Sequence, residues 1–156
     1  MMVMRQLFCT AMLCMALAAP ALAQNKAGEA LYATHCVVCH QVQAVGVPGI
    51  APALVGNIGR HASHEAGRAY LARVMLTGLV GPIQVDGVRY NGNMPSFAKL
   101  NDEEVAHVLT HVLSTYESVS DLAWLTPAFV ATTRQLGGTP NDTHQKRSRL
   151  TSATGG

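Results

Sequence analysis

The sequence has few aromatic residues, little charge and no long apolar run beyond its first residues. Aromatic side chains make up 5% of the 156 residues and charged side chains 13%. The formal net charge of +2 gives no electrostatic case for binding nucleic acid or an anionic membrane surface. A small domain with so few large side chains needs another source of buried area, which is a first indication of a bound cofactor.

The one long apolar stretch is at the N-terminus, where 19 of the first 23 residues are apolar. Arg5 precedes a mostly apolar run over 7–19, and Ala21-Leu22-Ala23 fits the small-x-small rule for cleavage before Gln24. A transmembrane anchor is the alternative, but a bilayer requires about 20 apolar residues. We therefore predict that 1–23 is a cleaved signal peptide. The mature chain would be exported, most simply to a bacterial periplasm, and would have no membrane span.

Cleavage would leave two of the four cysteines, Cys36 and Cys39, which stand three residues apart and directly before His40. C-x-x-C-H is the attachment signature for haem c. Two thiols at this spacing can add to the two vinyl groups on one edge of a haem, and the next imidazole is then held beneath the iron. We predict one covalently bound haem c with His40 as an axial iron ligand.

Other uses of a C-x-x-C pair have weaker support. A thioredoxin-like redox pair follows a strand of a βαβ unit, and the sequence shows no such unit. A structural zinc site needs further ligands; His61 and His64 are available, but a second cysteine pair is absent. A disulfide would have to close a three-residue gap.

The second axial ligand of such a haem is a sulfur or an imidazole. Two methionines follow the predicted signal peptide, Met75 and Met94. Met75 lies on the apolar stripe of a predicted helix, where a thioether is a common filler of an irregular core. Met94 lies in a turn-rich loop before Pro95, from which its thioether can reach the iron on the side opposite His40. The sequence therefore favours Met94.

The other histidines have simpler interpretations. We expect five of them to be solvated: His35, His61, His64, His107 and His144. His111 lies four residues after His107 and resembles half of a metal-binding pair, but H-x-x-x-H lacks the glutamate of a zincin. A role at the surface or at an interface is the simpler interpretation for His111.

Apolar periodicity predicts an all-α fold with long loops. The predicted helices span 26–35, 68–79, 101–116 and 126–136. Asn101 and Glu104 form a capping box at the start of the third helix, and Thr126-Pro127 is a typical start for the fourth. A short hairpin is expected at 83–90.

The predicted haem domain spans 24–118 and has three main helices around one covalent haem. A helical extension follows at 119–137, and the polar residues 138–156 are expected to be disordered. We expect an apolar cluster in the extension to pack back on the haem domain. The cluster comprises Leu122, Trp124, Leu125, Phe129 and Val130. We also expect that truncation after Tyr116 leaves haem ligation intact.

Between Lys26 and Tyr116 the chain resembles the class I monohaem c-type cytochromes. The haem signature comes near the start, and Pro52-Ala53-Leu54, a Met-Pro loop and a long last helix follow it. The segment 87–95 is similar to the small cytochromes that accept electrons from periplasmic dehydrogenases. The resemblance implies a cytochrome c fold.

The resemblance also implies roles for individual residues around the haem. Cys36 and Cys39 would form the thioether bonds, and His40 and Met94 would be the axial ligands. Pro52 would lie against the His40 ring, with a nearby backbone carbonyl accepting from the ring N–H.

More distant roles follow from the same resemblance. Arg60 would meet a haem propionate, and Tyr90 would reach a propionate or the ligand loop. Gly28 would let the first helix cross closely against the last one. The family usually has an aromatic residue at this crossing, where His111 stands here, so the crossing is expected to be weaker or pH-sensitive.

Two axial protein ligands leave no coordination position for a substrate, so we expect one-electron transfer rather than catalysis. The expected partners are redox proteins, with a dehydrogenase as donor and a terminal oxidase or another cytochrome as acceptor. Docking would use an apolar patch at the exposed haem edge. The alternatives are a permanent cytochrome subunit of a larger dehydrogenase, and a haem enzyme or gas sensor with a displaceable sixth ligand.

Overall fold

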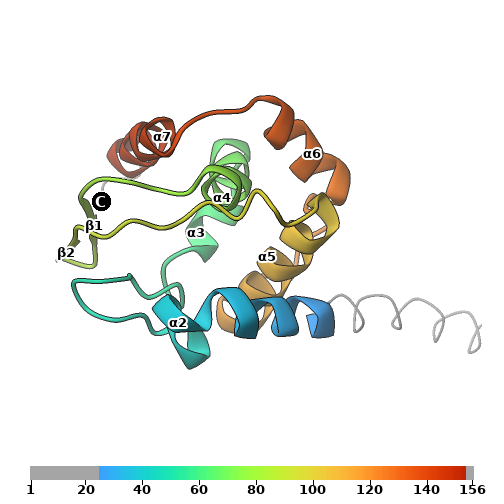
Figure 1. Ribbon diagram of the computed structural model, residues 1–156, viewed down its shortest axis with the longest axis horizontal. Helices are drawn as coiled ribbons and strands as arrows, with labels where there is room; N and C mark the ends of the chain where they lie inside the picture. The colour runs from blue at the N-terminus through green and yellow to red at the C-terminus, as the bar shows by residue number, and fades with distance from the viewer. Residues whose placement is uncertain (1–24, 154–156) are drawn as a thin grey trace, which may run out of the picture.

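The computed structural model describes residues 25–153, which are largely helical (Figure 1). The helices are the N-terminal helix at 25–35, α2 (Val37–His40), α3 (Gly59–Ala62), α4 (Glu65–Thr77), α5 (Asp102–Tyr116), α6 (Pro127–Gln135) and α7 (Pro140–Ala153). A 3₁₀ helix η1 (Val42–Ala44) and the strands β1 (Ile83–Val85) and β2 (Val88–Tyr90) complete the elements. Within 25–153 no helix is long and apolar enough to cross a membrane. The predicted signal peptide, 1–23, lies outside the described residues.

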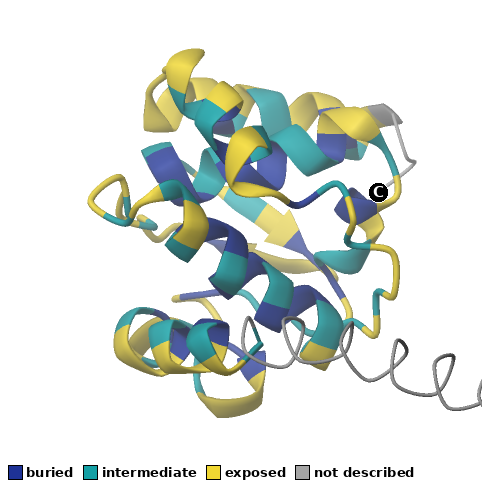
Figure 2. Ribbon diagram, turned by 90° about the vertical axis from the view of Figure 1, so that its right-hand side faces the viewer, coloured by how far each residue is buried: buried dark blue, intermediate teal, exposed yellow. Residues whose placement is uncertain are grey.

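The core forms around α5, whose first turn carries the predicted capping box. Asn101 Oδ1 accepts from the Glu104 N–H at 2.9 Å, and the Glu104 carboxylate accepts from the Asn101 N–H at 2.8 Å. Most of the buried side chains of α5 recur at helical spacing: Val105, Val108, Leu109, Val112 and Leu113. Figure 2 shows buried residues on the inward faces of the helices. The predicted all-α fold class is confirmed.

The N-terminal helix crosses α5 at Gly28, as the resemblance implies. A Cβ at this position would collide with the His107 carbonyl oxygen and would lie 2.7 Å from His111 Cβ. His111 is buried between the rings of Tyr32 and Tyr116, at centroid distances of 5.8 and 5.4 Å. The predicted surface role of His111 is therefore wrong, because its ring fills the crossing.

A hairpin connects α4 to the loop before α5. Gly78 ends α4 with a φ of +77°, and β1 pairs antiparallel with β2 so that Ile83 lies opposite Tyr90. Asp86 and Gly87 both have positive φ, which is typical of a two-residue hairpin turn. The predicted hairpin at 83–90 is confirmed.

The extension after Tyr116 packs back on the core, as predicted. Thr126 caps α6 by accepting from the Phe129 N–H at 3.1 Å, and Pro127 occupies its first turn. Leu125 and Val130 are buried in the hydrophobic core, and the Trp124 and Phe129 rings pack edge to face at 5.2 Å.

The predicted disorder of 138–156 is wrong for most of that segment, because residues 140–153 form α7. Thr139 and Asp142 make reciprocal side-chain-to-backbone hydrogen bonds of 2.8 and 3.2 Å at its start. Thr143 meets Thr77 of α4 through their hydroxyls at 2.5 Å, and Leu150 is buried in the core. Mainly polar contacts hold α7 against the rest of the protein. Its sequence therefore has almost no apolar periodicity from which a helix could be predicted. Figure 1 shows α7 lying over the hairpin and α4.

Candidate haem site

The two cysteines lie where the N-terminal helix turns into α2. The Cys36 N–H donates to the Tyr32 carbonyl at 2.9 Å, and the His40 N–H donates to the Cys36 carbonyl at 2.8 Å. Both cysteines are free, with Cys36 buried and Cys39 exposed. Burial, with a smaller contribution from Cys39, raises the pKa of the Cys36 thiol to about 11.

The imidazole of His40 is fixed by one backbone carbonyl. Its Nδ1 lies 2.9 Å from the Pro52 oxygen, and because a carbonyl only accepts, Nδ1 carries the proton and Nε2 is free to bind a metal. Burial lowers the pKa of His40, and the hydrogen bond to Pro52 opposes that shift only in part. The ring is therefore held neutral and oriented, which is the state in which histidine binds iron.

A tight loop brings Pro52 to this position. Gln41 and Gln43 have left-handed φ values of 63° and 65°. The Gly46 N–H then donates to the His40 carbonyl at 2.8 Å, and a Cβ on Gly46 would lie 2.5 Å from the Ala51 oxygen. The chain therefore folds back on itself after His40, and Pro52 comes to lie beside its ring.

The backbone of Met94 is pinned to the end of α4. Leu79 and Met94 exchange two backbone hydrogen bonds of 3.0 and 2.9 Å. A Cβ on Gly78 would lie 2.5 Å from the Met94 oxygen, so only glycine allows this approach. Met94 is half-buried, whereas Met75 is buried in the core as predicted. Both methionines also line the cavity described next.

A cavity of about 840 Å³ joins these elements, and this volume lies within the range of about 300–1,000 Å³ that is usual for cofactor sites. The walls include apolar side chains from α4 and α5, such as Leu71, Val74 and Leu109. Every residue predicted to hold the haem lines this cavity: Cys36, Cys39, His40, Pro52, Arg60, Tyr90 and Met94. The donor set therefore fits a haem, with two free thiols, an oriented imidazole, a thioether and an apolar enclosure.

One end of the cavity is polar, and the sequence did not predict most of its groups. Arg60 donates to the backbone and side-chain oxygens of Asn57 at 2.9 and 2.7 Å. His61 is buried with its ring 5.1 Å from the Tyr70 ring, so the prediction that His61 is solvated is wrong. Arg147 reaches this end from α7. Their separation along the chain explains why no local pattern indicated that these groups meet.

Burial of His61 has an electrostatic consequence. Its pKa falls to about 4, first because burial disfavours the charged ring and then because Arg147, Arg60 and His64 are nearby. His61 is thus a neutral polar group in this wall. Within 25–153, no group of three or more His, Cys, Asp or Glu side chains is arranged to hold a metal ion.

The sequence model of the cytochrome c family matches residues 25–116 of this chain, which include the whole apolar part of the cavity. The chain belongs to the cytochrome c family. It is 37% identical to cytochrome c-552 of Thermus thermophilus over 126 residues, which cover 79% of this chain and 95% of that protein. A second cytochrome c-552 of the same species is 38% identical over 126 residues, or 79% of this chain and 84% of its own. Cytochrome c of Kluyveromyces lactis is 40% identical over 46 residues, covering 30% of this chain and 42% of that protein.

Membership of the cytochrome c family establishes the fold, the cofactor and the general function. The cytochrome c fold carries one covalently bound haem c, and the chain is an electron-transfer protein whose partners are redox proteins. A match that covers 79% of this chain extends past Tyr116 wherever it begins. The similarity to the Thermus cytochromes therefore includes part of the C-terminal extension.

Proposed function

We propose that this cytochrome is an exported one-electron carrier whose haem iron is bound by His40 and Met94 and whose thioether bonds are formed by Cys36 and Cys39. The convergence of these four side chains on one cavity carries the proposal. When bound, the haem supplies a one-electron couple between ferric and ferrous iron. The protein supplies the ligands, their orientation and the exclusion of water.

His40 is suited to act as the fixed ligand. The Nδ1–H bond to the Pro52 carbonyl, 2.9 Å long, sets the ring orientation and makes the opposite nitrogen more basic. Because this bond is to backbone, it does not depend on another side chain being in place. We expect His40 to keep its orientation whichever ligand lies on the other side.

Met94 is better placed than Met75 to be the second ligand. Met75 is buried within α4, and its carbonyl accepts from the Phe97 N–H at 2.8 Å, so that its backbone is part of the packed core. Met94 comes from an irregular loop, is half-buried and precedes Pro95, which stiffens the loop. A thioether in this position favours the ferrous state and raises the potential relative to two histidines.

The mouth of the cavity is suited to brief contact with a redox partner. Val38 and Ile50 line the cavity and are 80% and 65% exposed, and Val42 and Val45 lie exposed nearby in the chain. An exposed apolar rim and a small net charge favour a weak, short-lived interface over tight electrostatic binding. We propose that a dehydrogenase is the donor and that a terminal oxidase or another cytochrome is the acceptor. Binding that weakens steeply with salt would contradict this description of the interface.

The experiment that tests the ligand set is a comparison of the optical spectra of the wild type and variants, each purified from the periplasm. We would record oxidised and reduced spectra of the wild type, of Met94→Ala and of Met75→Leu as a matched control. The expected result is a low-spin spectrum with a far-red sulfur-to-iron band that only Met94→Ala removes. Carbon monoxide should then bind rapidly to the reduced Met94→Ala protein alone.

Two outcomes would contradict the proposal. A band that persists in Met94→Ala would assign the ligand to another residue. Rapid binding of carbon monoxide to the reduced wild type would support the sensor or enzyme alternative. The mass of the periplasmic protein tests export separately, because cleavage before Gln24 removes 23 residues of the sequence.

A further inference from the structure

Arg147 is a cation in the polar end of the cavity, contributed by a helix beyond the segment that the cytochrome c family model matches. It lies on α7, whereas the family match ends at residue 116. Its Nη1 lies 3.5 Å from the Tyr70 hydroxyl, and its Nη2 donates to the Gln84 carbonyl at 3.3 Å. All three residues line the cavity.

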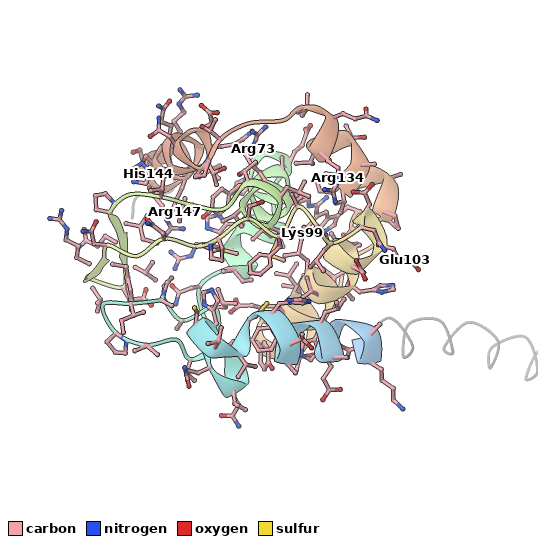
Figure 3. The ribbon with its side chains drawn as sticks, in the orientation of Figure 1. Arg73, Lys99, Glu103, Arg134, His144 and Arg147 are labelled. Atoms are coloured by element: carbon pink, nitrogen blue, oxygen red, sulfur yellow. The ribbon has the colours of Figure 1, made fainter. Side chains whose placement is uncertain are left out.

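Several contacts fix the place of α7 and therefore of Arg147. His144 Nε2 lies 2.7 Å from the Pro82 carbonyl, and Thr143 meets Thr77 at 2.5 Å. Leu150, one turn beyond Arg147, is buried in the core. Thr143, Arg147 and Leu150 lie on one face of a helix, because they are four and three residues apart. Figure 3 shows His144 and Arg147 on the side of α7 that faces the hairpin.

The charge of Arg147 is incompletely compensated. Among the residues that the structure describes, no carboxylate lies within 4.0 Å of its guanidinium. By contrast, Arg134 pairs with Asp102 at 2.8 Å, and Arg60 lies 3.9 Å from Asp86. A guanidinium has five N–H donors, and the two contacts of Arg147 are long, so donors remain for another acceptor.

The composition of this end indicates the acceptor. The charged side chains that line the cavity are Arg60, Asp86 and Arg147, and His61, Tyr70 and His144 line it as well. Asp86 is the one carboxylate among them, and its side chain is 69% exposed beside Arg60. The cavity therefore combines apolar walls with an excess of positive charge at one end. Haem has the complementary shape and charge, because its apolar ring carries two carboxylates along one edge.

We propose that Arg147 binds a haem carboxylate, with the Tyr70 hydroxyl beside it, and that α7 thereby closes the polar end of the cofactor cavity. A planar guanidinium suits a carboxylate because two parallel N–H···O bonds can form. Arg147 is a cofactor-binding residue in this scheme, and Tyr70 positions it. The inference depends on the proposed use of this cavity for the haem.

The test compares Arg147→Gln with Arg149→Gln in the full-length holoprotein. Arg149 is two residues along α7 and exposed, and it lines a separate surface hollow with Lys146 and Asp142, so both variants lose one charge from the same helix. The readout is the reduction potential measured across the pH range. Loss of a cation beside the haem stabilises the ferric form. Arg147→Gln should therefore lower the potential and move the carboxylate-linked pH transition upward.

Arg149→Gln should leave both quantities near their wild-type values, and Arg147→Lys should restore the potential in part. Equal shifts in Arg147→Gln and Arg149→Gln would overturn the inference, because they would reflect net charge alone. If Arg147→Gln does not fold, Arg147→Lys is compared with Arg149→Lys: the charge is kept in both, so a lower potential in Arg147→Lys alone supports a bidentate contact of Arg147, and an unchanged potential in both overturns it. Optical spectra distinguish a failure of this inference from a failure of the proposed function. An altered potential with an unchanged far-red band in Arg147→Gln supports the role of Arg147. A missing far-red band in the wild type contradicts the assignment of Met94 as a ligand.

Discussion

The segment 25–116 and the C-terminal segment 117–153 are held in place by different kinds of contact. Within 25–116, Val105 and Leu113 are completely buried, and the N-terminal helix meets α5 at Gly28 with no room for a side chain. In the C-terminal segment, α6 and α7 contribute few buried apolar residues and attach mainly through hydroxyls and arginines. The first segment is packed, whereas the second is mostly hydrogen-bonded onto it.

Arg134 of α6 illustrates this second kind of attachment. Its guanidinium donates to Asp102 at 2.8 Å, to the Ala98 carbonyl at 2.9 Å and to the Leu100 carbonyl at 2.7 Å. All three acceptors lie in the segment that runs from Met94 through the first turn of α5. Figure 3 shows Arg134 on α6. The C-terminal segment thus braces the loop that carries the proposed ligand without itself supplying a ligand.

The largest effect on stability is expected from a change in the packed segment. Gly28→Val would place side-chain carbon where the His107 carbonyl and His111 Cβ already lie. We expect it to lower the free energy of unfolding by about 3 kcal/mol, because backbone cannot move aside as a side chain can. Urea unfolding of the holoprotein measures this. Ala33→Val, at an exposed position of the same helix, is the control and should change little.

A smaller effect is expected from Arg134→Gln. The variant loses charge-assisted bonds to one carboxylate and two carbonyls, and we expect a loss of about 2 kcal/mol. The loop that carries Met94 should also loosen, so that the far-red band disappears at a lower temperature than in the wild type. Lys99→Gln, an exposed neighbour, is the control. A band as heat-stable as in the wild type would show that Arg134 does not brace the ligand loop.

The same difference explains how much could be predicted from the sequence. The capping box at Asn101 and the apolar stripe of α5 are local, so the helix was predicted. Thr139-Pro140 begins α7 just as Thr126-Pro127 begins α6. The sequence nevertheless predicts a helix only after Thr126-Pro127. After Thr126 come Phe129 and Val130, whereas among the side chains of α7 that the structure describes, Leu150 alone is apolar and buried in the core. Apolar periodicity cannot indicate a helix that docks through threonine and arginine.

The residues of the candidate site also differ in whether a local sequence pattern can indicate them. The sequence predicts Cys36, Cys39 and His40 because covalent attachment imposes a short, fixed spacing, and Met94 because a Met-Pro loop is distinctive. His61 and Arg147 come together across 86 residues of sequence through the docking of α7. No pattern in one sequence encodes that proximity, because it depends on three elements packing together.

Within 25–153, two histidines are buried: His61 in the cavity wall and His111 at the crossing of the N-terminal helix with α5. His111 allows a test of pH-dependent stability away from the cavity. Burial lowers its pKa and Glu29 only partly opposes this, so the unfolded chain takes up a proton first as the pH falls below the ordinary value of 6.5. Stability should therefore decrease as the pH falls from 6.5 towards the folded-state pKa. His111→Phe should remove this loss. Its effect at pH 7 should be small, because removing the unpartnered Nε2 is offset by losing the contact of Nδ1 with Asn25 Oδ1 at 2.8 Å.

Urea midpoints at pH 7 and pH 5 measure both effects. His111→Gln is the matched control, since it keeps a polar group but cannot titrate. It should also flatten the pH dependence, because glutamine does not titrate in this range. If the wild type and His111→Phe lose the same stability between pH 7 and pH 5, another group is responsible for the acid sensitivity.

The smallest effect on global stability is expected from removing the helix cap at the start of α7. Thr126→Ala and Thr139→Ala each remove one helix cap, with an intrinsic cost of about 1 kcal/mol. The cap of α6 is coupled to the core through Val130, so Thr126→Ala should lower the global stability by nearly that amount. Thr139→Ala should instead increase hydrogen exchange in α7 and leave the urea midpoint almost unchanged. Equal global losses would mean that α7 unfolds together with the core, and that the two segments form one cooperative unit despite their different contacts.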